Sequence, residues 1–220
     1  FMTLGSRIGQ EKFYNYITAF GFREKTGVGI PGEQTGYHYS LSSFSDLDLA
    51  TSSFGQGFKI TPLQLISAVC SVANDGNYMQ PYIISQITDS NGNVVLSNSP
   101  KVVRKTVSKE NSDIICSYLE DAVTEHIKKA YIEGYHVAGK TGTSQKLDSK
   151  NEDGVVDKKI ASFIGFAPAD DPQICVLVVV DEPNSEVQYG SLIAAPLAKS
   201  ILQDCLKLIG LEPDIEDSVD

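Results

Sequence analysis

Three extended apolar segments in the second half of the chain constrain the fold more than any other feature. They cover Tyr135 to Thr143, Ile160 to Phe166 and Gln173 to Val180. The third contains the longest apolar run of the sequence, whose length and β-branched residues predict a buried strand. Because only Pro168–Pro172 separates the second segment from the third, these two strands are predicted to be antiparallel neighbours.

Helical spacing predicts a helix at each end of the chain. Residues 1–20 carry apolar positions at helical intervals, interrupted by Gly5 and Gly9, which predicts one helix or two short ones. From Ser191 to Ile209, apolar residues again recur with helical spacing. We expect the buried face of this last helix to consist of Ile193, Leu197, Ile201, Cys205 and Leu208.

A capping box marks the start of a further helix. Thr61 suits the N-cap position, Pro62 suits the first helical position, and Gln64 lies three residues after the cap. The helix is predicted to end at Asn74–Gly76, where the chain carries turn-forming residues. Its expected buried stripe is Leu63, Ile66, Val69, Cys70 and Ala73.

Between these helices the sequence predicts a β-hairpin and another amphipathic helix. Tyr82–Thr88 alternates as a strand does, and Ser90–Asn93 is a typical hairpin turn that leads to Val94–Leu96. Lys101–Val107 is predicted to be extended. Residues 110–123 then show the spacing of an amphipathic helix.

The chain is acidic, and its composition is that of a globular protein. Its 220 residues include 18 Lys and Arg against 28 Asp and Glu, a formal net charge of −10. Such a field repels phosphate backbones, so we predict no binding to nucleic acid. Part of the excess lies in residues 212–220, which we predict to be a solvated acidic tail. No apolar stretch reaches the roughly 18 to 20 residues that a membrane span needs.

The four cysteines predict neither a disulfide framework nor a zinc ribbon. Cys70, Cys116, Cys175 and Cys205 are far apart, and no CxxC pair occurs. We expect them to be buried thiols that pack as small hydrophobic side chains. A metal site that combines scattered ligands such as His136 and Cys175 stays open as an alternative, and no cofactor is predicted.

The segment with the most chemical information runs from Gly134 to Thr143. Its first part, Gly134–Thr141, fits the phosphate-loop pattern, and Asp181 and Glu182 follow an apolar strand as the magnesium-binding acids of ATPases do. A phosphate loop must, however, follow a buried strand and lead straight into a helix. The residues before it are polar, and those after it contain Gly142 and no apolar helical stripe. The context therefore argues against a P-loop NTPase, which stays the alternative.

A second interpretation makes the same residues a strand that carries Lys-Thr-Gly beside an active-site cleft. Lys140 would present an ammonium group to a substrate carboxylate, and Thr141 or Thr143 would offer a hydroxyl. Gly142 would let a substrate backbone lie close to the strand. The backbone N–H of Thr143 would help to stabilise a developing oxyanion. Three residues recur by chance, so the value of this pattern depends on what surrounds it.

With its surroundings, the segment resembles the class B penicillin-binding proteins, the D,D-transpeptidases that cross-link peptidoglycan. The third motif of that family is matched in full by Val137–Lys146. The resemblance covers nearly the whole chain and looks most like the division and spore-cortex type of Gram-positive bacteria. The other matching stretches are Phe20–Phe22, Lys25–Val28, Pro31–Glu33, Ala50–Gly57, Ile60–Gln64, Ala73–Gly76, Gln80–Ile83, Phe163–Pro168, Tyr189–Gly190 and Ala194–Pro196.

The resemblance implies an α/β (α+β) fold of the serine β-lactamase and transpeptidase type, an antiparallel sheet with helices on both faces. The Lys-Thr-Gly strand is expected at the sheet edge, with the next two strands beside it and the last helix packed on the sheet. Residues 1–211 would be the C-terminal part of a transpeptidase domain that is incomplete at its N-terminal side. The family's nucleophile lies in Ser-x-x-Lys, a pattern that does not occur here. The family's further serine lies in Ser-x-Asn, which occurs here only at 149–151, after the third motif rather than before it. The chain alone is therefore expected not to acylate.

In the intact enzyme, the resemblance implies that a serine from an upstream segment attacks the D-Ala-D-Ala end of a stem peptide, and that β-lactams trap the acyl-enzyme. Lys140, Thr141 and Thr143 would hold the substrate carboxylate, while Tyr189 and Gly190 would shape the rim of the site. The family implies action at the outer face of the bacterial cytoplasmic membrane, through an upstream anchor and with membrane partners in cell-wall synthesis. A non-enzymatic β-lactam sensor on the same fold stays open as another class.

Overall fold

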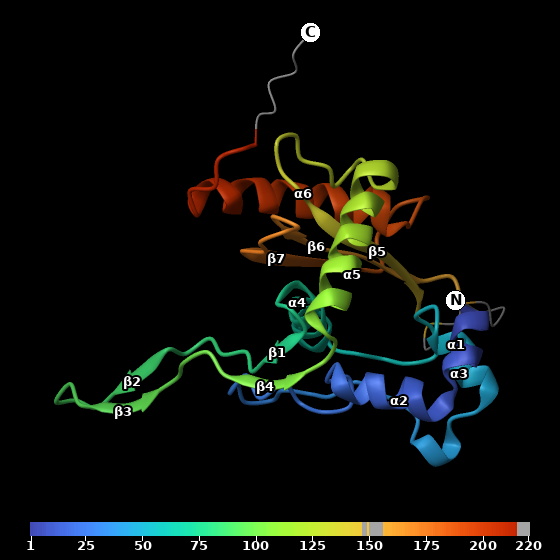
Figure 1. The fold of residues 1–220 in the computed structure, drawn as a ribbon, viewed down its shortest axis with the longest axis horizontal. Helices are drawn as coiled ribbons and strands as arrows, with labels where there is room; N and C mark the ends of the chain where they lie inside the picture. Colours follow the sequence, from blue (N-terminus) through green and yellow to red (C-terminus); the bar gives the residue numbers. More distant parts are fainter. Residues whose placement is uncertain (147–148, 150–155, 215–220) are drawn as a thin grey trace, which may run out of the picture. The chain divides into compact units, whose positions relative to one another are not determined.

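The computed structural model describes residues 1–146, 149 and 156–214 (Figure 1). The chain divides into two compact units, Phe1–Lys109 and Glu110–Asp220. Only the first three residues of the predicted acidic tail are among the described residues, and the remainder lies outside them. In the described part, no helix is both long enough and apolar enough to cross a membrane.

The first unit opens with two short helices, α1 (Met2–Ile8) and α2 (Gln10–Ala19). Gly9 separates them with a φ of 82°, a left-handed conformation that glycine adopts without a steric penalty. Of the two arrangements expected for this segment, the one with two short helices is confirmed. A 3-10 turn (Leu41–Ser43) and helix α3 (Asp46–Ser52) follow.

Helix α4 (Pro62–Ala73) begins at the predicted capping box. The Gln64 N–H donates to the Thr61 hydroxyl at 3.1 Å, and the Thr61 N–H donates to the Gln64 side-chain oxygen at 2.9 Å. This fully buried amide also ties the start of α4 to loops that are distant in the sequence. Its remaining partners are the Gly36 N–H at 3.2 Å and the carbonyls of Gly21 at 3.3 Å and Glu24 at 2.8 Å.

The buried face of α4 differs from the predicted one. The five apolar residues of the predicted stripe are only half-buried. The fold instead buries Gln64, Ser67, Ala68, Ser71 and Val72. Polar side chains can occupy this face because their groups find partners: the Ser71 hydroxyl bonds the Ala68 carbonyl at 2.7 Å and the Thr106 hydroxyl at 3.0 Å.

Two antiparallel pairs of strands complete the first unit. β1 (Asn77–Met79) pairs with β4 (Val102–Lys105), and β2 (Gln86–Thr88) pairs with β3 (Val94–Ser97). The β2–β3 pair confirms the predicted hairpin, although β2 begins later than the predicted Tyr82. β1 carries no sequence signal, since three residues are too few for an alternation to show.

The second unit contains a three-stranded antiparallel sheet in the order β5-β6-β7. The strands are β5 (Ala138–Gln145), β6 (Lys159–Ala167) and β7 (Ile174–Asp181). The chain reaches the sheet through helix α5 (Lys109–Asp121), which begins at the unit boundary, and a π-helical turn (Ala122–His126). The three predicted strands and their antiparallel pairing are confirmed, as is the edge position of β5 among the described residues. The predicted burial of the third strand is wrong, because the residues of β7 are half-buried or exposed.

Helix α6 (Gly190–Leu208) packs on this sheet as predicted, but through a different face. The predicted face is wrong: Leu197 is 50%, Ile201 44% and Leu208 84% exposed. The residues that are buried are Ala194, Ala195, Ala198, Leu202 and Leu206, which share one core with Phe163 and Ala167 of β6. Because the alanine side chains are small, the helix backbone approaches the sheet closely.

Candidate active site

Strand β5 carries the Lys-Thr-Gly segment and has no second neighbouring strand among the described residues, so one of its edges is free. One hydrogen bond shows which residues of β5 direct their backbone groups towards β6. The Lys146 N–H donates to the carbonyl of Lys158, the residue just before β6, at 3.0 Å. Hydrogen-bonded pairs alternate with non-hydrogen-bonded pairs along an antiparallel ladder. Every second residue before Lys146, including Gly142 and Lys140, therefore turns its backbone groups towards β6.

The residues in between present their backbone groups to the open edge. Thr141 and Thr143 are two of these residues, so the Thr143 N–H points away from β6. The side chains of Lys140 and Thr141 leave opposite faces of the strand, as those of neighbouring strand residues do. The Lys140 Nζ nevertheless donates a hydrogen bond to the Thr141 carbonyl at 3.3 Å. The Lys140 ammonium group therefore lies at the open edge of β5, beside the outward-facing backbone of Thr141. Such an edge suits an anionic substrate group and a developing oxyanion.

The first residue of α6 packs directly on this segment. The Gly190 N–H donates to Thr143 Oγ1 at 3.2 Å, which satisfies one of the N–H groups left unpaired at a helix N-terminus. A Cβ on Gly190 would lie 2.3 Å from the Ser162 carbonyl oxygen and 2.5 Å from that of Gly142. Only glycine fits here between the helix and the two strands. Because the Thr143 oxygen accepts from the helix, its own proton stays available for a substrate.

The two residues predicted at the rim of the site differ in their environment. Gly190 is buried and contacts Thr143, as described above. Tyr189 is the N-cap of α6 and is 55% exposed, and its ring centre lies 5.6 Å from the Lys159 ammonium nitrogen. A contact between Tyr189 and substrate stays a prediction.

Sequence reasoning missed an ion-pair network that ties the far end of β5 to the end of β7. The Lys146 Nζ lies 2.7 Å from the Glu182 carboxylate and 2.9 Å from that of Asp181. The Lys158 Nζ also lies 2.6 Å from Glu182. The hydrogen bonds to Glu182 and Asp181 raise the pKa of Lys146, and those from the two lysines lower the pKa of Glu182. The network connects the two outer strands across β6, and only the fold brings its members together.

These contacts leave the phosphate-loop interpretation without support. Gly139, Lys140 and Thr141 lie inside β5 rather than in a loop that leads into a helix. Asp181 and Glu182, the candidate magnesium ligands, are engaged by lysines. Among the described residues, no group of three His, Cys, Asp or Glu side chains is placed to hold a metal ion.

Two histidines are expected to titrate on opposite sides of the usual midpoint. The Nδ1 of His136 lies 2.5 Å from the Glu120 carboxylate, and this hydrogen bond raises the pKa of His136 above 6.5. Burial lowers the pKa of His38, whose ring stacks on Phe58 with centres 5.1 Å apart. Proton NMR titration should give a midpoint above 6.5 for His136 and one below 6.5 for His38.

The two shifts act on stability with opposite signs. The contribution of the His136–Glu120 pair is present below pH 6.5 and is lost as the pH rises through the raised pKa of His136. The contribution of neutral His38 is present above pH 6.5 and is lost as the pH falls through its lowered pKa. Glu120→Gln should return the His136 midpoint towards 6.5 and leave that of His38 in place. A His136 midpoint at or below 6.5 would contradict the first assignment, and a His38 midpoint at or above 6.5 would contradict the second.

Comparison with known sequences gives the same family. A profile of the penicillin binding protein transpeptidase domain matches residues 1–203. Stage V sporulation protein D of Bacillus subtilis (strain 168) is 41% identical over 215 residues, which cover 97% of this chain and 33% of that protein. Peptidoglycan D,D-transpeptidase FtsI of Buchnera aphidicola is 36% identical over 200 residues, 89% of this chain and 33% of that protein. The chain thus spans about a third of the length of these relatives.

Solved structures agree with the sequence comparison. Penicillin binding protein 3 of Mycobacterium tuberculosis, complexed with ampicillin, superposes with a TM-score of 0.86 at 27% identity, over 99% of this chain and 50% of that one. The apo-form of that protein gives a TM-score of 0.85 at 28% identity, over 96% of this chain and 49% of that one. The expected fold class and the resemblance are both confirmed. The chain belongs to the family of penicillin-binding protein transpeptidase domains.

Proposed function

We propose that this chain supplies the substrate-carboxylate and oxyanion side of a peptidoglycan D,D-transpeptidase site. The observation that carries the proposal is the free edge of β5, where the Lys140 ammonium group lies beside the outward-facing backbone of Thr141. The Lys140 ammonium and the hydroxyls of Thr141 and Thr143 bind the carboxylate of the terminal D-alanine. The outward N–H of Thr143 donates to the carbonyl oxygen that becomes negative in the tetrahedral intermediate.

The proposed reaction proceeds through a serine ester. The serine oxygen attacks the carbonyl carbon of the D-Ala–D-Ala amide, the C–N bond breaks, and D-alanine leaves with the proton that the serine lost. An amine of a neighbouring stem peptide then attacks the ester carbonyl carbon, and the bond from that carbon to the serine oxygen breaks. The amine proton passes to the serine oxygen, which regenerates the hydroxyl, and the new amide is the cross-link. Because no Ser-x-x-Lys occurs in the 220 residues, the proposal requires a nucleophile from outside this sequence.

We propose the same edge as the site of β-lactam recognition. Structures of penicillin binding protein 3 of Mycobacterium tuberculosis hold ampicillin and aztreonam, molecules that carry an anionic group beside a reactive carbonyl. That charge distribution matches an ammonium group beside an outward N–H. Stem peptides are cross-linked outside the cytoplasm, so we propose action at the outer face of the cytoplasmic membrane, with an anchor and membrane partners outside this sequence.

Lys140→Ala tests the carboxylate-binding role. In a chimera in which this chain replaces the matching third of stage V sporulation protein D, the variant should react with a fluorescent penicillin roughly tenfold to a hundredfold more slowly. The physical reason is that a charge-assisted hydrogen bond is worth about 1.5 to 3 kcal/mol. The rate is followed as the labelled band on a denaturing gel, and intact mass identifies the labelled polypeptide.

The matched control is Lys207→Ala, which removes an exposed lysine from the last turn of α6. This variant should label at the unchanged rate, and the chain by itself should take up no label. Label on the isolated chain would reveal a nucleophile within it and contradict the proposed site. A folded chimera that takes up no label would contradict the proposed function.

A further inference from the structure

The β2–β3 hairpin of the first unit exposes an unusual number of apolar side chains. Every residue from Tyr82 to Val103 is exposed, and the two strands extend away from β1 and β4 (Figure 1). The large aliphatic residues of the hairpin and its base are Ile83, Ile84, Ile87, Val94, Val95 and Leu96, with Ile83 70% and Val95 68% exposed. Clustered exposed apolar side chains mark interaction surfaces in soluble proteins.

The edges of this hairpin carry no protection against pairing with a further strand. Among the described residues, β2 and β3 pair only with each other, so each keeps one open edge of backbone N–H and C=O groups. Natural edge strands are commonly blocked by charged side chains or proline. From Tyr82 to Asn98 the only charged residue is Asp89, and its carboxylate is occupied within the turn by the N–H groups of Asn91 and Asn93.

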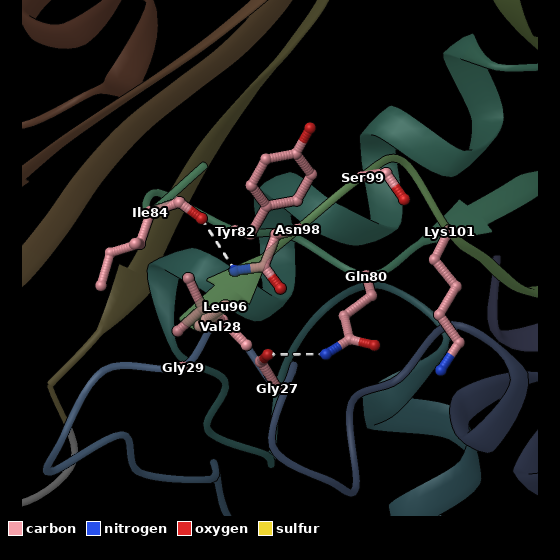
Figure 2. Close-up of a pocket in the computed structure, with 10 residues that line it drawn as sticks. All are labelled: Gly27, Val28, Gly29, Gln80, Tyr82, Ile84, Leu96, Asn98, Ser99 and Lys101. Carbon is pink, nitrogen blue, oxygen red and sulfur yellow. Dashed lines mark hydrogen bonds between the residues drawn. The ribbon is translucent and has the colours of Figure 1, made fainter. Parts of the chain in front are cut away.

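A cavity of about 230 Å³ lies at the base of the hairpin (Figure 2). Its apolar wall is formed by Val28, Ile84 and Leu96. Two hydrogen bonds join residues that line the cavity: the Asn98 amide donates to the Ile84 carbonyl at 2.8 Å, and the Gln80 amide donates to the Gly27 carbonyl at 2.9 Å. The volume is below that of most small-molecule pockets, and it suits one large apolar side chain.

The charges around the cavity and along the hairpin favour one kind of binding partner. Among the residues that the structure describes, Lys101 is the one charged side chain that lines the cavity. The hairpin between Tyr82 and Asn98 carries a single acid, whereas the whole chain has a net charge of −10. A second copy of this chain would bring its own large negative charge to the contact, which disfavours self-association. An apolar segment with an acidic end would instead match both the hairpin and Lys101.

We propose that the hairpin and its cavity form a docking site for an extended segment of another protein. The segment adds a strand along the open edge of β3, which leads directly into the cavity-lining residues Asn98 and Lys101. One large apolar side chain of the segment fills the cavity, and an acidic group of the segment pairs with Lys101. Strand addition is a common mode of peptide recognition, in which backbone hydrogen bonds give affinity and pockets give selectivity.

The probe is a fluorescein-labelled peptide of about ten residues that alternates valine and threonine, with a leucine next to a glutamate at one end. Fluorescence anisotropy with the full 220-residue chain should show saturable binding. Val95→Lys should weaken binding by about tenfold or more, because it places a charge in the middle of the open edge. A peptide with lysine in place of glutamate should bind about fivefold more weakly, because it repels Lys101.

Leu208→Lys is the matched control, since it makes the same change at a residue of α6 that is 84% exposed. It should leave the affinity unchanged, and unchanged urea midpoints would show that both variants are folded. Equal affinity for the unmodified chain and for Val95→Lys would overturn the proposal. Absence of saturable binding would also overturn the proposal. A dimer that is seen by sedimentation and is abolished by Val95→Lys would instead show that the hairpin binds a second copy of the chain.

Discussion

Gln64→Leu is expected to lower the free energy of unfolding of the first unit by roughly 4 kcal/mol. The substitution keeps the volume nearly constant, but it removes the amide that four backbone groups share. The groups left without a partner are the N–H groups of Gly36 and Thr61 and the carbonyls of Gly21 and Glu24. Each buried polar group without a hydrogen bond costs about 1 to 3 kcal/mol, and some relax towards water. Urea unfolding followed by circular dichroism measures the difference.

The matched control for this change is Gln34→Leu. The Gln34 side chain is exposed, and within the described part of the chain it donates one hydrogen bond, to the Gly32 carbonyl. Its replacement should change stability by no more than about 0.5 kcal/mol, as surface substitutions usually do. If Gln64→Leu unfolds at the same urea concentration as Gln34→Leu, the amide does not organise the loops as described.

Gly190→Ala is expected to damage both stability and the site. The added Cβ would meet the Ser162 carbonyl oxygen at 2.3 Å and that of Gly142 at 2.5 Å, so α6 must move off β5 and β6. Overpacking of this kind costs about 3 kcal/mol when the backbone is the obstacle. The movement also breaks the hydrogen bond from Gly190 to Thr143 and shifts the edge strand. In the chimera, penicillin labelling should therefore fall by about a hundredfold or more.

The neighbouring residue supplies the control, because Ser191→Ala makes a small change in the same helical turn. It should leave the labelling rate and the urea midpoint close to those of the unmodified chain. A temperature series separates the two effects of Gly190→Ala, since a purely unstable variant would recover its labelling rate on cooling. Recovery to the full rate at low temperature would contradict a direct effect on the β5 edge.

The sequence predicted those helices and strands that are determined by interactions between residues close together in the chain. The capping box at Thr61 and Gln64 places the start of α4 because both partners belong to the same helical turn. The hairpin turn at Ser90–Asn93 places β2 against β3 for the same reason. The apolar run in β7 predicts a strand because its β-branched residues favour extended backbone whatever surrounds them.

Which face of a helix is buried could not be predicted in the same way. In α6, the spacing that fits Leu197 and Ile201 fits Ala198 and Leu202 equally well, since both stripes are apolar and both follow the helical period. The fold buries the second stripe because small side chains let the helix backbone approach Phe163 of β6. This choice depends on the partner surface, which no local pattern describes.

The sequence by itself determined the chemistry of this protein: the Lys-Thr-Gly strand, the neighbouring strands, and the residue types that can bind a carboxylate. The tertiary structure decided how that chemistry is presented. Only the antiparallel order of the sheet leaves the Thr143 N–H on an open edge, and only the packing of α6 brings Gly190 onto Thr143 across 47 residues of sequence. Such contacts depend on long-range packing, in which each position is defined by atoms that are distant along the chain.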